Sequence, residues 1–178
     1  QFPENLIDLT AIAELETITS SDEMLRLGSN LTLTRAIEDP LVRARLPVLV
    51  EALRTIGSEQ VRNVATLAGN VANASPIADG ASALLGRDAR LVLASARGER
   101  TLPLEQFYQG YKVTALGEHE IIRAIELPLS PGFRSFAKFS KRSALDIASV
   151  NSCFACEVEA RVIRRCRIAF GGVAVFPK

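Results

Sequence analysis

Tryptophan, histidine and methionine are the scarcest residues of this sequence of 178 residues, with no tryptophan, one histidine and one methionine. The single histidine, His119, lies in the polar loop Leu116–Glu120, where we expect it to be solvated. Neither a catalytic triad nor a multi-histidine metal site is expected from such a sequence. Hydrolase and zinc-enzyme functions are therefore disfavoured.

The sequence also lacks a large net charge, because it contains 21 basic and 20 acidic residues. This balance provides no broad positive field for nucleic acid or an anionic membrane, so neither partner is expected. No apolar run approaches the roughly 20 residues of a membrane-spanning helix, and no signal peptide is evident. We therefore expect a cytoplasmic protein. Because the chain starts at Gln1 and stops soon after a strand-like run, we also expect a piece of a longer protein.

Cysteine is sparse, and its odd count of three fits a reducing compartment better than a disulfide framework. Cys153 and Cys156 have the spacing of a C-x-x-C motif, but they lie in the apolar stretch 147–160, which is typical of a buried strand. We interpret them as core residues. An iron–sulfur or thiol site at this pair remains a weaker alternative. The glycines form neither G-x-G-x-x-G nor G-x-x-x-x-G-K, which disfavours the usual nucleotide-binding folds.

Apolar residues make up 48% of the sequence and charged residues 23%, as in a globular protein. Helices and strands are mixed rather than strictly alternating, which favours an α+β fold with flanking helices around a mixed or antiparallel sheet. The elements expected before residue 130 are strands at 15–19, 24–28, 64–71, 89–95, 100–104 and 120–127, helices from 32 or 34 to 39 and over 41–56, and a helical turn at 104–108.

Proline and glycine punctuate this pattern. Pro47 is expected to interrupt the second helix. Ser75 is expected to cap a further helix with Pro76 as its first residue and Gly86 at its end. The run Ser130-Pro131-Gly132 marks a boundary between residues 1–129 and 130–178. Beyond it, the segments 135–140, 147–160 and 162–170 predict a small three-stranded antiparallel sheet.

The segment 61–79 is polar in an unusual way, because it places threonine, asparagine, serine and aspartate among small residues. Small side chains allow a flat ligand to approach the backbone, and amides and hydroxyls offer directed hydrogen bonds. A helix N-terminus at Pro76 would favour an electron-rich group. The segment is therefore a candidate cofactor cradle. A capped turn, whose polar side chains satisfy only the loop backbone, is an equally open interpretation.

The run 60–79 closely resembles the flavin-binding segment of the FAD-binding domain of the molybdenum hydroxylases, the xanthine dehydrogenase family. The segments 107–114, 120–128 and 136–148 resemble further blocks of that domain, in the family's order. The resemblance implies an FAD domain of a xanthine-dehydrogenase-like small subunit, with a C-terminal three-stranded sheet. It implies that electrons from iron–sulfur clusters pass through FAD to NAD⁺ or another acceptor. Molybdopterin and the 2Fe-2S clusters would belong to partner subunits or domains.

The resemblance also implies FAD contacts, with no catalytic residue and no metal ligand on this chain. Thr66, Gly69 and Asn70 match positions where strand and loop meet the flavin, and Asn73 and Asp79 match polar contacts. Ile121 and Ile122 match apolar positions that pack on the cofactor, and Lys138 matches a basic contact. Ser75 is added from the polar cradle. The positions expected to bind FAD are thus Thr66, Gly69, Asn70, Asn73, Ser75, Asp79, Ile121, Ile122 and Lys138.

Three features depart from the family's pattern. Ile56 stands where some members have an aromatic residue, and Ala68 stands where the family usually has a glycine, so that its methyl group is expected to alter the turn or displace the flavin. The family's glycine-rich pyrophosphate loop precedes the segment matched by residues 2–9 and is not in this sequence. Ala68 and the missing loop favour an alternative, a non-catalytic domain of the same fold that docks subunits and has lost FAD.

Overall fold

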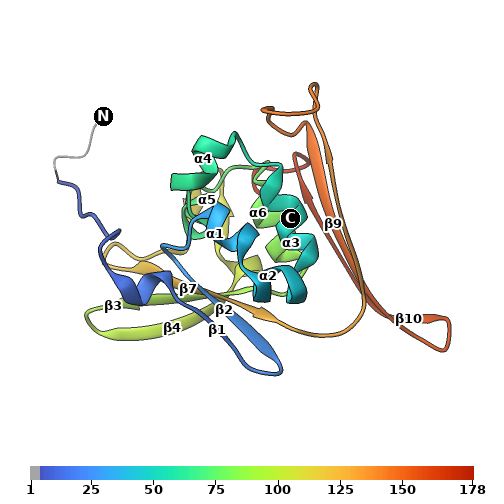
Figure 1. The fold of residues 1–178 in the computed structure, drawn as a ribbon, viewed down its shortest axis with the longest axis horizontal. Helices are drawn as coiled ribbons and strands as arrows, with labels where there is room; N and C mark the ends of the chain where they lie inside the picture. The colour runs from blue at the N-terminus through green and yellow to red at the C-terminus, as the bar shows by residue number, and fades with distance from the viewer. Residues whose placement is uncertain (1–4) are drawn as a thin grey trace.

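The computed structural model describes residues 5–178, so that residues 2–4 of the family-like segment 2–9 lie outside the described part. A five-stranded sheet forms one layer of the molecule (Figure 1), in the order β1-β2-β7-β3-β4 with all neighbours antiparallel. Its strands are β1 (Ile18–Ser20), β2 (Met24–Gly28), β3 (Arg90–Ser95), β4 (Gly98–Pro103) and β7 (Ile121–Pro128). A 3-10 helix, η1 (Ala13–Glu16), precedes it.

Residue alternation on the central strands explains why this sheet forms. Leu25 and Leu27 of β2 and Leu91 and Leu93 of β3 are buried on the side of the helices. On β2 the intervening residue Arg26 is charged and pairs with Glu126 of β7 at 3.3 Å, whereas Val92 of β3 is buried on that side. An apolar face and a mostly polar face are typical of an antiparallel sheet that is covered on one side.

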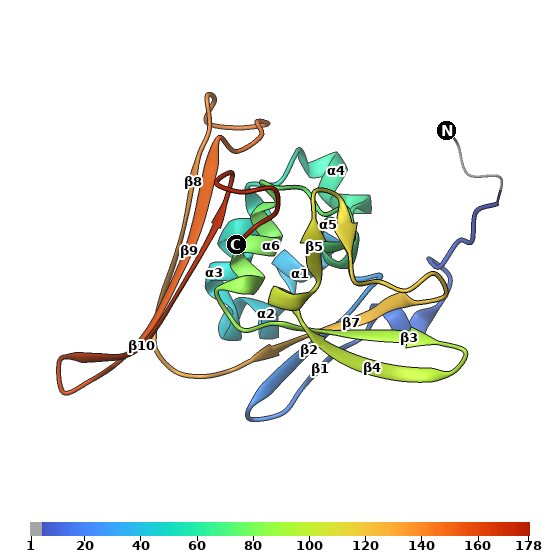
Figure 2. The ribbon, with the colours of Figure 1, turned by 180° about the vertical axis from the view of Figure 1, so that it is seen from behind.

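Six short helices cover the apolar face (Figure 1). They are α1 (Leu33–Glu38), α2 (Pro40–Arg45), α3 (Pro47–Arg54), α4 (Glu59–Val64), α5 (Leu67–Ala72) and α6 (Asp79–Leu85). The 3-10 helix η2 (Leu104–Gln106) and the hairpin of β5 (Tyr108–Gly110) and β6 (Val113–Thr114) lie near α5 (Figure 2). No helix among the described residues is long and apolar enough to cross a membrane.

A second sheet stands beside the helical layer, next to α3 and α6 (Figures 1 and 2). It contains β8 (Phe133–Phe139), β9 (Val150–Glu159) and β10 (Val162–Gly171) in the antiparallel order β10-β9-β8. Phe136, Cys153 and Ala169 of its three strands belong to the same buried cluster as the leucines of the first sheet. The α+β fold class and the separate three-stranded sheet expected from the sequence are therefore confirmed.

Most local expectations hold. The interruption at Pro47, the hairpins β1–β2 and β3–β4, the turn η2 and Gly86 as a C-cap are all present. The strand expected over 64–71 is wrong, because this stretch forms the end of α4 and most of α5. Its buried residues Leu67, Ala68 and Val71 repeat at helical spacing.

The expected start of the next helix is also wrong. Residues 75–78 form a turn, in which the Ala78 amide donates to the Ser75 carbonyl at 3.2 Å, and α6 begins only at Asp79. Ser75 is therefore not an N-cap and Pro76 is not the first helical residue. The N-cap position belongs to Ala78, whose side chain makes no capping hydrogen bond.

Candidate functional site

A buried ion pair joins the helical layer to the three-stranded sheet. Lys138 Nζ, on β8, lies 2.7 Å from Asp79 Oδ2 at the start of α6. Both side chains are largely buried, at 11% and 7% exposure. Lys138 Nζ also donates to the Thr55 carbonyl at 2.8 Å, just after α3. Removing charged groups from water is costly, so this pair depends on the additional hydrogen bonds around it.

Asn151 of β9 completes this network from the other side of Asp79. Its Nδ2 donates to Asp79 Oδ1 at 2.6 Å and to the Ile77 carbonyl at 3.1 Å. Gly171 of β10 leaves room for this amide, since a Cβ at Gly171 would lie 2.6 Å from Asn151 Oδ1. Both carboxylate oxygens of Asp79 are thus engaged within the protein, where they fix Lys138.

Lys138 lines a cavity of about 730 Å³ beside this network. Its wall comes from the end of α3 and the start of α4 on one side, and from the end of β8 and the following loop on the other. The lining residues lie within the two segments 54–62 and 138–146. A volume of this size is typical of sites for cofactors and other small molecules, which fill about 300–1,000 Å³.

Positive charge predominates in the cavity wall. Its basic residues are Arg54, Arg62, Lys138, Lys141 and Arg142, and its acidic residues are Glu59 and Asp146. Asp146 lies 3.5 Å from Arg142 and accepts the backbone amide of the same residue at 2.9 Å, and these contacts lower the pKa of its carboxyl group. The surplus of cations suits an anionic or electron-rich ligand.

Thr66 and Asn70 differ in their contacts around α5. Thr66 is the N-cap, and its hydroxyl accepts the Gly69 amide at 3.0 Å. Asn70 Oδ1 is buried and has no hydrogen-bond partner among residues 5–178. It lies against Gly80, where an added Cβ would approach it to 2.6 Å. Asn70 and the start of α6 are therefore neighbours, and Asn70 retains a free acceptor.

Asn73 and Ser75 lie outside the network around Asp79. Asn73 ends α5 and accepts Lys112 Nζ on its backbone carbonyl at 2.7 Å and on Oδ1 at 3.1 Å. Ser75 is half-buried in the turn before α6. Neither lines the cavity of Lys138.

The two isoleucines of β7 differ in burial. Ile122 is 6% exposed and belongs to the core, whereas Ile121 is 37% exposed. Adjacent strand residues point to opposite faces of a sheet, so the two side chains do not share one surface. Of the predicted positions, the structure joins Asp79 to Lys138 directly and brings Asn70 next to α6, while the others are distributed around them.

Two residues of the network were absent from the sequence-based set. Asn151 is fully buried at an inward position of an apolar strand, and a polar residue in such a place is a recognisable signal. Thr55 donates its hydroxyl to Asp79 Oδ2 at 3.3 Å, but its role depends on a tertiary contact that no local pattern reveals.

Cys153, Cys156 and Ala68 are buried, whereas Cys166 is exposed. Cys153 and Cys156 are buried on β9 three residues apart, so their side chains alternate to opposite faces. Burial raises the pKa of the Cys153 thiol to about 11. In residues 5–178 no three His, Cys, Asp or Glu side chains are placed to hold a metal ion. The Ala68 methyl group packs in the core at 6% residue exposure, so the expected displacement of a ligand by this group finds no support.

Comparison with known sequences identifies the family. The family described as the FAD binding domain in molybdopterin dehydrogenase matches residues 1–130, and the CO dehydrogenase flavoprotein C-terminal domain matches residues 135–178. The xanthine dehydrogenase FAD-binding subunit of Escherichia coli is 36% identical over 178 residues, covering 97% of this chain and 61% of the relative. The carbon monoxide dehydrogenase medium chain of Hydrogenophaga pseudoflava is 32% identical over 173 residues, covering 97% and 60%.

Solved structures show the same fold. A carbon monoxide dehydrogenase from Hydrogenophaga pseudoflava that lacks the Mo-pyranopterin moiety matches with a TM-score of 0.94 and 30% identity, over 99% of this chain and 62% of its own. Quinoline 2-oxidoreductase from Pseudomonas putida matches with a TM-score of 0.92 and 28% identity, over 99% and 61%. The chain thus spans about three fifths of these relatives. These findings confirm the predicted resemblance, and the chain belongs to the family of FAD-binding domains of molybdopterin dehydrogenases.

Proposed function

We propose that this chain is the FAD-holding part of an oxidoreductase of the xanthine dehydrogenase type, in which electrons from iron–sulfur clusters reach NAD⁺ or another acceptor through the flavin. The observation that carries this proposal is the basic cavity whose wall includes the buried, oriented Lys138. Family membership supports the identity of the cofactor, and the relatives named above are dehydrogenases and an oxidoreductase.

The residues present fit a flavin in three respects. The volume of about 730 Å³ is adequate for a dinucleotide-sized ligand that remains partly exposed. The cationic wall suits the negative charge of a pyrophosphate or of a reduced ring. Outside this cavity, next to Gly80, the buried Oδ1 atom of Asn70 lacks a partner within residues 5–178 and would accept a hydrogen bond from a donor on the ligand.

The chain's own residues would bind and orient the cofactor. Lys138 would place a fixed positive charge at the cavity, and Asp79 and Asn151 would hold that charge in position. Thr66, Gly69, Asn70, Asn73 and Ser75 remain proposed contacts at α5 and the turn after it, as do Ile121 and Ile122 on β7. FAD, when bound, supplies the redox chemistry, and the protein supplies position and electrostatics.

We further propose a molybdopterin-binding subunit and a 2Fe-2S domain as partners, NAD⁺ as the acceptor and the cytoplasm as the location. The three free cysteines support a reducing compartment. We keep the division at Ser130, which assigns residues 1–129 to flavin binding and residues 130–178 to the C-terminal sheet. The ranges of the two matched families, 1–130 and 135–178, support it.

The experiment is a titration of the full-length, FAD-free subunit with FAD, followed by visible absorbance, for the parent and for Lys138→Met. Loss of a charged hydrogen bond removes about 1.5–3 kcal/mol, so the dissociation constant should rise about 10- to 150-fold. Lys138→Arg, which keeps the cation, should lose less affinity. Lys178→Met, at an exposed lysine away from the cavity, is the matched control and should bind like the parent.

Two results would contradict the proposal at different levels. A parent subunit that stays colourless and takes up no FAD would favour the alternative of a docking domain without cofactor. Equal affinity of Lys138→Met and the parent would leave FAD binding intact but remove Lys138 from the site.

A further inference from the structure

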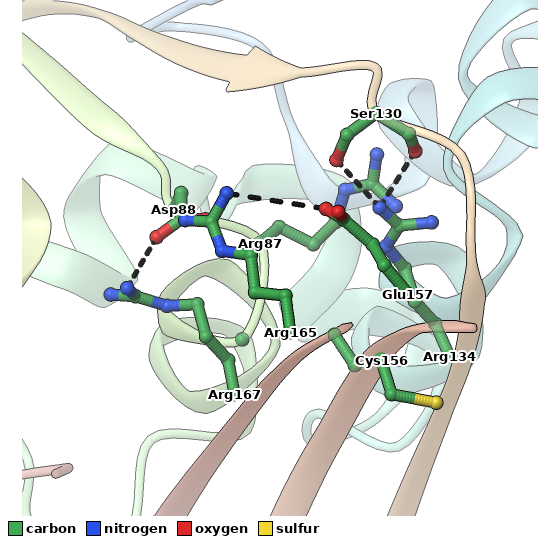
Figure 3. Close-up of a pocket in the computed structure, with 10 residues that line it drawn as sticks. Arg87, Asp88, Ser130, Arg134, Cys156, Glu157, Arg165 and Arg167 are labelled. Carbon is green, nitrogen blue, oxygen red and sulfur yellow. Dashed lines mark hydrogen bonds and ion pairs between the residues drawn. The ribbon is translucent and has the colours of Figure 1, made fainter. Parts of the chain in front are cut away.

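A second, much smaller cavity lies at the C-terminal end of α6, beside the linker between the two sheets (Figure 3). Its volume is about 20 Å³. The turn after α6, the linker before β8, and strands β8, β9 and β10 contribute to its wall. Because one water molecule needs about 10–15 Å³ by the same measure, this cavity accommodates a single particle of about that size.

Two arginines of this wall have buried Nε atoms: Arg87 is a buried residue, whereas Arg134 is partly exposed. Arg87 is 6% exposed and donates to the Pro128 carbonyl at 2.9 Å. Arg134 donates to Ser130, to its carbonyl oxygen at 2.7 Å and to its Oγ at 2.8 Å. The Nε atoms of both arginines are buried and have no hydrogen-bond partner within residues 5–178. Two cations at one small cavity therefore each keep an unused N–H donor.

The acidic side chains around the cavity are committed to other arginines. Asp88 accepts Arg165 at 2.7 Å and Arg167 at 2.6 Å, as Figure 3 shows for Arg167. Glu157 lies 4.0 Å from Arg165. In the described part of the chain, no carboxylate lies within ion-pair distance of Arg87 or Arg134.

Arg87 remains charged at neutral pH. Burial, followed by repulsion from Arg134, lowers the pKa of Arg87 to about 10, so that it is still a cation at neutral pH. A buried charge without a counter-ion is strongly unfavourable, and hydrogen bonds to carbonyl groups compensate it only in part. A negatively charged ligand in the cavity would therefore compensate the buried charge better than a neutral polar ligand.

We propose that this cavity binds one small monovalent anion of the chloride class between Arg87 and Arg134. The free Nε–H groups provide charge-assisted donors, and the volume excludes tetrahedral oxyanions and carboxylate metabolites. Arg87 follows α6 and reaches the end of β7, whereas Arg134 is on β8 and holds the linker. A bound anion would therefore fasten the connection between the two sheets. This site is independent of FAD binding.

The test compares thermal unfolding of the full-length subunit in sodium chloride and in sodium gluconate at equal ionic strength. At chloride concentrations well above the dissociation constant, the midpoint should be about 2–4 °C higher than in gluconate. Arg87→Gln and Arg134→Gln should each abolish this difference. Arg164→Gln, at an exposed arginine on β10 that pairs with Glu159, is the matched control and should keep it.

A second measurement requires no variant. Crystals of the parent protein soaked in sodium bromide should show an anomalous peak between the guanidinium groups of Arg87 and Arg134. Absence of this peak, or a water molecule in its place, would overturn the proposal, as would equal midpoints of the parent in the two salts. A chloride-dependent rise that persists in both Arg87→Gln and Arg134→Gln would place the anion elsewhere and would also overturn it.

Discussion

At the scale of single residues, both carboxylate oxygens of Asp79 contact other side chains of the protein. Its Oδ2 accepts Lys138 at 2.7 Å and its Oδ1 accepts Asn151 at 2.6 Å, so that the carboxylate is held within the protein. Lys138 is the member of this group that also lines the large cavity. We therefore propose that Asp79 would act on FAD through Lys138, as a positioning residue.

The ion pair should show strong coupling when its partners are replaced. In the FAD-free protein, Asp79→Asn and Lys138→Met should each lower the free energy of unfolding by about 3–5 kcal/mol, because each leaves a buried group without its counter-charge. The double variant should lose less than the sum, since no unpaired charge remains. Urea denaturation of the four proteins measures this difference.

The control for this cycle is Glu159→Gln, which removes the exposed pair of Glu159 and Arg164. Exposed pairs contribute at most about 1 kcal/mol, so little change is expected. Strictly additive losses in Asp79→Asn and Lys138→Met would show that the two groups do not depend on each other.

At the scale of elements, α5 shows how a short helix depends on its ends. It has only six residues, and its buried face consists of Leu67, Ala68 and Val71. Isolated helices of this length are unstable in water, so packing and capping must stabilise it. The hydroxyl group of Thr66 provides the cap at 3.0 Å from the Gly69 amide. A residue predicted to bind FAD thus also has a structural role.

Substitution of Thr66 in the FAD-free protein tests the structural role alone. Thr66→Ala should lower the free energy of unfolding of the FAD-free protein by about 1 kcal/mol, since an N-cap is lost. Thr66→Ser, which retains the hydroxyl group, should remain close to the parent. Thermal denaturation monitored by circular dichroism measures both. A Thr66→Ala protein as stable as the parent would mean that the cap contributes nothing.

At the scale of the whole molecule, the helical layer connects the two sheets. All seven residues of α6 are buried, and the helix contacts α3, α5, β9 and β10. Leu91 of the first sheet and Phe136 of the second belong to one buried cluster. The large cavity lies between segments on either side of Ser130, so both parts of the chain form it.

One shared core predicts one cooperative unit. In hydrogen exchange of the full-length protein, peptides from α6, β9 and β3 should reach the same free energy of opening, with the same dependence on denaturant. Mass spectrometry over a denaturant series measures this. Exchange of β8 to β10 at clearly lower free energy than β3 and β7 would show two independent units instead.

The local pattern of the sequence determined much of this protein. Period-two apolar residues determined the strands of both sheets, proline determined the break between α2 and α3, and the polar segment 61–79 marked the region of Asn70 and Asp79. These features depend on neighbouring residues, which the sequence contains directly. The sequence did not, however, predict how the nine positions expected to bind FAD are arranged relative to one another.

Tertiary structure alone decided how that set is arranged. Residues 64–71 became helical because Leu67, Ala68 and Val71 pack together into the core, and α6 began at Asp79 because Lys138 and Asn151 hold that carboxylate from the second sheet. Asn151 is 72 residues from Asp79, and Lys138 is 59 residues from it. Contacts over such separations depend on the packing of distant elements, and no local pattern of residues encodes them.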